Sequence, residues 1–377
     1  MKANTYAAFA AASLSLALAG SLDAAHRVVT DRATIEKTEL PKATGGPSAG
    51  KRNEKLEVVA LFPDTMLAGV VTTRDGRIFM SFPRWNDVEF SAAELTKEGK
   101  LSPVPNLALH QTSDGERRLV SVQGLDVDAN GRLWMLDAPN AKLHCVDLAS
   151  AAVVKTLRPS NKTLGTSTYA NDVRIDLRRG SEGFAFISDT AGAGVIVMDL
   201  ASGASRRRLS KATSARSDKA FDPCVEGKPL AMRGHTDGIA LSPDGKTLYY
   251  HSLSRRALFS VSADALADMD ATDEQVEAMI RKIANKTSAS DGILCDGENR
   301  VYTTDYEDGA IRRWTPGAGE DHSGETIVQD ERLLWPDACA IHGGWLYVTT
   351  NQLNRAKKVP PYALFRVPVE ATGIGEN

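Results

Sequence analysis

The chain has little net charge, few aromatic residues and few cysteines for its length. Of 377 residues, 45 are Lys or Arg and 48 are Asp or Glu, so the formal net charge is −3 and nothing points to a nucleic-acid partner. Four cysteines without a C-x-x-C pair support neither a dense disulfide framework nor a zinc site. No apolar run of helix length follows the first twenty residues, so the sequence predicts no membrane span in the mature protein.

The N-terminal region lacks the pattern of a folded domain. Lys2 precedes an apolar stretch at residues 7–19 that ends in small residues, which predicts a secretory signal peptide over residues 1–19. Residues 20–54 are polar and contain clustered Gly and Pro, which predicts a flexible leader. We therefore expect a secreted or periplasmic protein whose folded domain covers residues 55–370.

One pattern recurs six times in that domain. It consists of a small residue, an alternating apolar strand, a turn that contains Gly and a second apolar strand. The copies begin at Gly69, Gly124, Asp172, Gly238, Gly292 and Ala338. A hairpin unit repeated roughly every 50 residues is typical of four-stranded propeller blades. The sequence thus predicts an all-β fold, a six-bladed β-propeller, whose ring closes by pairing of residues 56–62 with residues 362–369.

One segment departs from the strand pattern. Thr272 and Gln275 form a capping box, and apolar residues follow at helical spacing as far as Ile283. We expect one short inserted helix between the fourth and fifth blades, packed over one end of the ring.

Polar residues stand at the start of five of the six predicted inner strands. They are Gln123, Asn171, Asp172, Asp237, Asp291 and Asp337. Because inner strands run along the axis in a common direction, we expect these side chains to converge at one mouth of the channel. Converging carboxylates repel one another unless a cation or bound protons compensate their charge. Taken singly, each Asp is also explained as a turn residue that bonds its own backbone.

These residues suggest roles in a site. Asn171, Asp237 and Asp291 are the predicted ligands of a hard divalent ion, Ca²⁺ or else Mg²⁺ or Mn²⁺. Gln123, Asp172 and Asp337, together with Tyr169 and Asn351, are expected to contact a small-molecule ligand. Asp291 is placed to take a proton. His235 is a second candidate general base, although a lone His beside a strand is more often a hydrogen-bonded structural group. Arg84 and Trp85 are candidates to cover the mouth, although a packed Trp with an Arg stacked on it is the default arrangement.

Several segments resemble the Yellow/major royal jelly protein family. They are SFPRW at 81–85, LSPVPN at 101–106, YANDVRID at 169–176, SASDG at 288–292 and VTTNQLNR at 348–355. The resemblance runs in order from about Leu56 to Val367. It implies a secreted six-bladed propeller, and the insect members include dopachrome-converting enzymes and non-catalytic binders of biogenic amines.

A weaker resemblance is to the gluconolactonase/regucalcin group. In that group an Asn-Asp-Gly, an Asn-Gly and an Asp-Gly before the inner strands hold a divalent ion, together with a Glu from the first blade. Asn171, Asp237 and Asp291 match three of these positions, whereas Leu67 and Ala68 stand where the Glu would be.

Different classes of function stay open at this point. The first is an exported enzyme acting on a small molecule at the channel mouth, either by metal-assisted hydrolysis of a lactone or ester or by Yellow-type tautomerisation without a metal. The second is a non-catalytic protein that binds a small ligand. A third is a protein-interaction platform, which would present a large exposed apolar patch.

Overall fold

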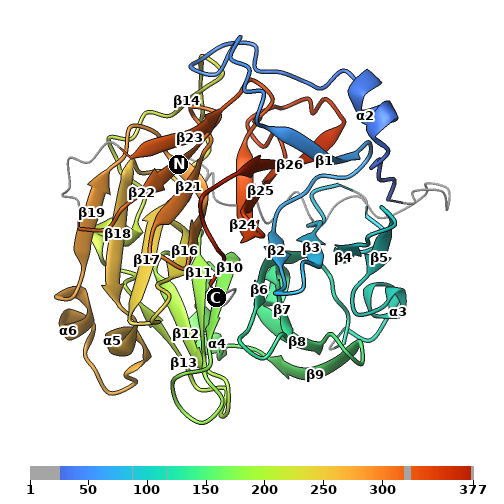
Figure 1. Cartoon of the computed structure of the whole chain (residues 1–377). Coiled ribbons are helices and arrows are strands. Elements are labelled where there is room, and N and C mark those ends of the chain that lie inside the picture. Colours follow the sequence, from blue (N-terminus) through green and yellow to red (C-terminus); the bar gives the residue numbers. More distant parts are fainter. Residues whose placement is uncertain (1–25, 87, 116, 318–323, 375–377) are drawn as a thin grey trace.

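The computed structural model describes residues 26–86, 88–115, 117–317 and 324–374. Six four-stranded antiparallel sheets are arranged around a central axis, which confirms the predicted six-bladed β-propeller (Figure 1). The strands of a blade follow one another from the innermost, beside the axis, to the outermost.

Blades one to three follow the chain in order. Blade one has β2 (Val70–Thr72), β3 (Ile78–Ser81), β4 (Ala92–Leu95) and β5 (Leu101–Pro103). Blade two has β6 (Val122–Val127), β7 (Leu133–Asp137), β8 (Lys142–Asp147) and β9 (Ala152–Leu157). Blade three has β10 (Ala170–Asp176), β11 (Phe184–Asp189), β12 (Val195–Asp199) and β13 (Ser205–Arg208).

Blades four to six complete the ring. Blade four has β16 (Thr236–Leu241), β17 (Thr247–Ser252), β18 (Ala257–Ser262) and β19 (Arg281–Asn285). Blade five has β20 (Ser290–Cys295), β21 (Val301–Asp305), β22 (Ala310–Trp314) and β23 (Glu325–Gln329). Blade six has β24 (Pro336–His342), β25 (Trp345–Thr350), β26 (Tyr362–Pro368) and β1 (Glu57–Phe62).

The two ends of the folded domain meet in blade six. Strand β1 pairs antiparallel with β26, with Phe62 opposite Tyr362 and Glu57 opposite Arg366, which confirms the predicted closure. The inner strands contact one another in the closed order β2, β6, β10, β16, β20, β24 and back to β2. Closure therefore brings residues from all six blades to one central channel.

The β6–β7 hairpin shows how a repeat sequence dictates its turn. The Asp128 carboxylate accepts hydrogen bonds from the backbone N–H groups of Asn130 (2.9 Å) and Arg132 (3.0 Å). Gly131 takes the left-handed conformation that closes this turn, at φ 74°. The indole of Trp134 donates to the other oxygen of Asp128 at 2.8 Å, so the turn and the blade core are joined.

The helices are short. They are α2 (Arg32–Lys37), α3 (Leu107–Gln111), α4 (Asn161–Leu164), α5 (Ala263–Ala267), α6 (Asp273–Glu277) and the 3₁₀ turns η1 (Ala138–Asn140) and η2 (Thr213–Ala215). The capping box of Thr272 and Gln275 is present at α6. Its predicted location is wrong, because α6 lies within blade four, between β18 and β19. Ile283, expected to continue the helix, belongs to β19.

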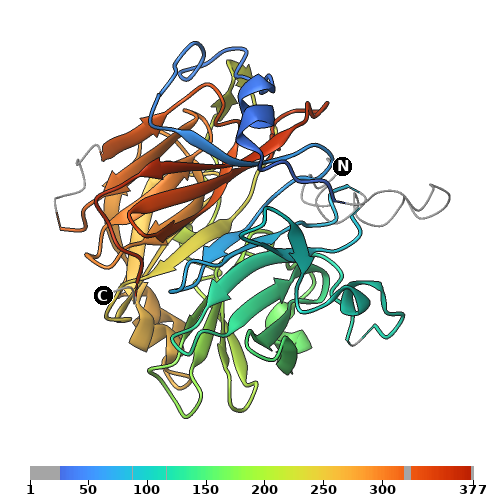
Figure 2. The same ribbon diagram turned by 45° about the vertical axis from the view of Figure 1, so that its right-hand side comes forward.

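Residues 26–54 lie along the ring rather than apart from it (Figure 2). Val29 forms a β-bridge with Leu61 of β1. Further on, the Ala43 N–H donates to the Glu331 carbonyl at 2.7 Å, and the Thr44 N–H donates to the Glu226 carboxylate at 3.0 Å. The predicted signal peptide lies outside the described residues. Along the described chain we find no helix long and apolar enough to cross a membrane.

Ring closure can be weakened at a single side chain. Phe62 of β1 is fully buried in the cluster between blades six and one. Phe62→Ala is expected to lower the free energy of unfolding by about 3–5 kcal/mol, because a buried ring is lost and a cavity is left. Urea unfolding measures the change. Val154→Ala, at a side chain that is 53% exposed, is the control and is expected to stay within about 0.5 kcal/mol. Equal changes in the free energy of unfolding for both variants would contradict the role of the β1–β26 pairing in stability.

Candidate functional site

The predicted polar residues occupy β-bulges inside the inner strands. Pairing between the first two strands of a blade skips two residues at each of five positions: 123–124, 171–172, 237–238, 291–292 and 337–338. The expectation that these residues precede the strands as entry turns is therefore corrected. A bulge leaves its residues outside the regular ladder and turns their side chains. Here the bulges direct polar groups toward the axis.

Hydroxyl groups on the second strands hold these bulges together from blade to blade. Ser81 accepts the Gly69 N–H at 2.8 Å and donates to the Gln123 carbonyl of blade two at 2.6 Å. Thr304 and Thr349 make the equivalent pair of hydrogen bonds from blade five to six and from blade six to one. The polar positions are thus fixed relative to one another by direct contacts between blades.

Three carboxyls form the centre of the site, and we call Asp237, Asp291 and Asp337 the acidic ring. All three are nearly inaccessible in the folded chain. Burial raises the pKa of Asp291 to about 7, and the Asp172 charge adds to the shift. Burial raises the pKa of Asp237 and of Asp337 well above the ordinary value, and repulsion from Asp291 acts in the same direction.

Each member of the acidic ring has a neutral hydrogen-bond donor beside it. The Asn171 amide donates to Asp237, and the Asn351 amide donates to Asp337 at 2.5 Å. The Trp335 indole donates to Asp291 at 2.5 Å. Neutral donors orient these carboxyls but leave their negative charge uncompensated.

Trp335 was not foreseen from the sequence, and neither was its neighbour Tyr306. Their rings stack with centroids 4.2 Å apart. Trp335 has a φ of 54°, a strained conformation for a bulky residue and one that is commoner at functional sites. Phe221 and Val225, from the insertion between blades three and four, pack against the same pair. The insertion therefore covers the Asp291 side of the acidic ring.

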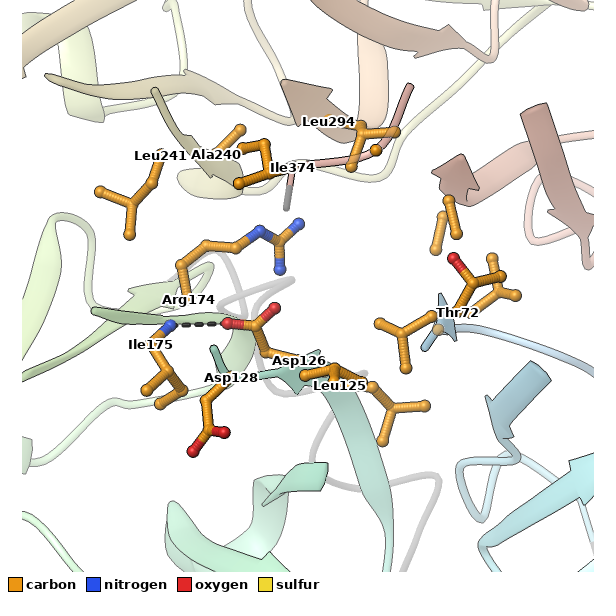
Figure 3. A pocket seen from close by; sticks show the side chains of 18 of the residues that line it. Thr72, Leu125, Asp126, Asp128, Arg174, Ile175, Ala240, Leu241, Leu294 and Ile374 are labelled. Carbon is orange, nitrogen blue, oxygen red and sulfur yellow. Dashed lines mark hydrogen bonds between the residues drawn. The ribbon is translucent and has the colours of Figure 1, made fainter. Parts of the chain in front are cut away.

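A cavity of about 750 Å³ follows the channel from the acidic ring toward the hairpin turns of the blades. Figure 3 shows the Arg174 side chain extending into the middle of this space, with Asp126 beside it and Ile374 across from it. Gln123, Asn171 and Asp172 also line the cavity. Six of the predicted site residues thus surround one space, as expected from the common direction of the inner strands.

The remaining predicted residues do not line this cavity. The Tyr169 hydroxyl donates a hydrogen bond to the Gln123 side chain at 3.2 Å, and Tyr169 is also hydrogen-bonded to Trp85. Tyr169 therefore holds the Gln123 side chain in place without lining the cavity itself. His235 accepts the Ser217 N–H at 3.0 Å through Nδ1, which directs its imidazole toward the insertion. Asn351 reaches the site only through Asp337.

The predicted metal ligands do not form a ready cage for a hard ion. The Asn171 side chain directs its amide nitrogen, rather than its oxygen, at Asp237. One oxygen of Asp291 is occupied by the Trp335 indole. In the part of the chain that the structure describes, no group of at least three His, Cys, Asp and Glu side chains is arranged to hold a metal. The arrangement instead suits carboxyls that hold protons.

Comparison with known proteins agrees with this architecture. A family model described as major royal jelly protein matches residues 120–361. The chain belongs to the major royal jelly protein family. Within this family, the chain is 27% identical over 325 residues to the L-dopachrome tautomerase yellow-f of Drosophila melanogaster, covering 75% of this chain and 73% of that protein. It is 24% identical over 282 residues to major royal jelly protein 1 of Apis mellifera, covering 68% of this chain but only 64% of that protein.

Among solved structures, a gluconolactonase from Xanthomonas campestris shares the fold. The TM-score is 0.53 at 12% sequence identity, over 87% of this chain and 98% of that one. At this identity the likeness concerns the propeller alone. This member of the royal jelly family therefore shares its fold with that gluconolactonase, and a shared fold does not imply a shared function.

The raised pKa of Asp337 predicts how stability depends on pH. The folded state binds the Asp337 proton more tightly than the unfolded state does, so stability is lost as pH rises from about 4 through the raised pKa. Asp337→Asn removes this loss. The melting temperature of the variant is expected to exceed that of the parent by about 2–4 °C at pH 8, and to equal it near pH 4. Asp270→Asn, at an exposed carboxylate, serves as the control. An equal decrease at both pH values would contradict this account.

Proposed function

We propose that this protein is an exported enzyme that transfers a proton within a small ring compound bound in the channel, a reaction of the tautomerase type. The observation that carries the proposal is the Asp291 carboxyl, which lines the cavity and has a pKa raised to about 7. A carboxyl whose pKa lies near the working pH can both accept and return a proton. The family relative named as an L-dopachrome tautomerase supports a substrate of this kind.

The acidic ring supplies both a base and an acid. In the proposed step, ionised Asp291 removes a proton from a ring carbon, and protonated Asp237 donates its proton to the carbonyl oxygen of the same substrate. One C–H bond is broken and one O–H bond is formed, so the substrate is isomerised without an oxidant or reductant. Neighbouring carboxyls that cannot all ionise together provide such a pair. The two carboxyls return to their starting states by exchanging protons with water.

Neighbouring groups of the chain position this pair. The Trp335 indole fixes the orientation of Asp291, and the Asn171 amide does the same for Asp237. The insertion that packs on Trp335 keeps bulk water from this side of the carboxyls. Exclusion of water strengthens the electrostatic interactions on which the proton transfer depends.

Activity on L-dopachrome is expected to depend on pH in a bell shape. The acidic limb of kcat/KM falls near pH 7, because Asp291 must be ionised, and the alkaline limb reflects loss of the proton on Asp237. Asp291→Asn is expected to lower kcat by about 10²–10⁴-fold. Absorbance of the aminochrome follows the reaction.

Asp270→Asn carries the same chemical change on the surface and is expected to leave kcat unchanged. If Asp291→Asn and Asp237→Asn both kept full turnover, the acidic ring would not be the catalytic site. Saturable binding of the aminochrome without product would favour the non-catalytic ligand-binding alternative.

The hydrolytic alternative depends on a divalent ion. Its support is the mutual repulsion of the ring carboxyls, which Ca²⁺ or another hard cation would relieve as bound protons do. It requires Asn171, Asp237 and Asp291 to turn their oxygens to one ion. For the proton-transfer function we expect removal of divalent ions with EDTA to leave kcat unchanged. Loss of activity that Ca²⁺ restores, together with hydrolysis of a lactone, would favour the alternative.

A further inference from the structure

Arg174 of β10 is a charged group inside the channel that the proposed proton transfer does not use. Its side chain is only 16% exposed, and it reaches toward the centre of the cavity rather than to the outer surface (Figure 3). Burial acts to lower the pKa of Arg174, but the charges of Asp172 and Asp126 outweigh that effect and keep the guanidinium charged. A charged guanidinium that is mostly buried in a channel wall is a strong partner for an anion.

The hydrogen bonds of Arg174 leave part of the guanidinium available. Nη1 donates to Asp172 at 2.7 Å and to the Val173 carbonyl at 2.5 Å. Nη2 donates across the channel to the Ile293 carbonyl of blade five at 3.2 Å. In the described chain Nε has no acceptor, although a guanidinium carries five N–H groups. A ligand in the cavity can therefore accept hydrogen bonds from Arg174 without displacing Asp172.

Arg174 and the acidic ring line the same cavity of about 750 Å³, so one molecule bound there can contact both. Asp172, which holds the guanidinium, is near enough to Asp291 and Asp337 for its charge to raise the pKa of each. On the other side of Arg174, the Asp126 carboxyl accepts the Ile175 N–H at 2.7 Å. Burial raises the pKa of Asp126 to about 7, although the charge of Arg174 acts in the opposite direction.

We propose that Arg174 determines substrate specificity by binding a carboxylate on the substrate while the acidic ring acts on the carbonyl-bearing part of the same molecule. This inference rests on the proposed function and narrows its substrate class to small ring compounds that carry a carboxylate. An Arg–carboxylate pair gives direction as well as affinity, because parallel N–H donors fix the plane of the bound group. It would hold the reacting ring in one orientation against Asp291.

Binding of a non-reacting pair of probes tests the proposal. The probes are indole-2-carboxylate and its methyl ester, titrated calorimetrically into the full chain at pH 7.5. The parent protein is expected to bind the acid about tenfold or more tightly than the ester. Arg174→Gln is expected to abolish this preference, and Arg174→Lys to reduce it, because Lys keeps the charge but lacks the planar fork. Arg281→Gln on the outer strand β19 is the matched control and is expected to keep the preference.

Several results would overturn the inference. The parent protein could bind both probes equally, or it could bind neither. Arg174→Gln could also keep the preference for the acid over the ester. In each of these cases Arg174 only neutralises Asp172. If Arg174→Gln does not fold, Arg174→Lys decides, and an unchanged preference in that variant overturns the inference. The proposed function is judged separately by turnover. A carboxylate preference without turnover would refute proton transfer alone, and turnover that depends on Asp291 without the preference would refute the role of Arg174 alone.

Discussion

Closure of the ring by the antiparallel pairing of β1 with β26 is the constraint on which the site depends. Only a closed ring forces six inner strands to share one axis, and only then do residues as distant in sequence as Asn171 and Asp337 face the same space. The bulges turn the polar side chains inward, and hydroxyls such as Ser81 join neighbouring bulges through direct hydrogen bonds. The position of each carboxyl is thus a property of the whole ring rather than of its own blade.

The fold compensates the charge of some buried carboxyls with a guanidinium, but not that of the acidic ring. Asp330 is fully buried, yet hydrogen bonds from the Arg332 guanidinium keep its pKa low despite that burial. Asp291 is also enclosed, but among the described residues the one hydrogen bond to its carboxyl comes from the neutral indole of Trp335, so burial raises its pKa. Leaving carboxyls without cations costs stability, and natural proteins tolerate such a cost mainly where function requires it. This contrast separates the acidic ring from a structural ion pair such as that of Asp330 and Arg332.

Much of this arrangement could be predicted from sequence because its signals are local and repeated. Turns such as that at Gly131 mark each hairpin, and the common strand direction then places Asp237 and Asp291 at one mouth. The bulges could not be predicted, because the alternation of side chains gives no sign of a two-residue skip. In the sequence, Arg174 occupies an ordinary polar position of an alternating strand. Its location inside the channel depends on the residues across the axis, which the sequence of its own strand does not reveal. His235 was a candidate base, but its imidazole is directed by Ser217 of an insertion that follows no repeat.

Blade one differs from the other five blades because it places no polar side chain at the bulge position of its inner strand. In blade one, Leu67 is fully buried in the core between blades six and one, and Gly69 and Val70 form the cavity wall there. The acidic ring comes from blades four to six, whereas blades two and three line the same cavity with Gln123, Asn171, Asp172 and Arg174. On the blade-one side Gly69 and Val70 contribute no polar side chain, so polar groups do not enclose the channel completely at this level. A bound ion needs ligands all around it, so this open side fits the proposed oriented small molecule better than an enclosed cation.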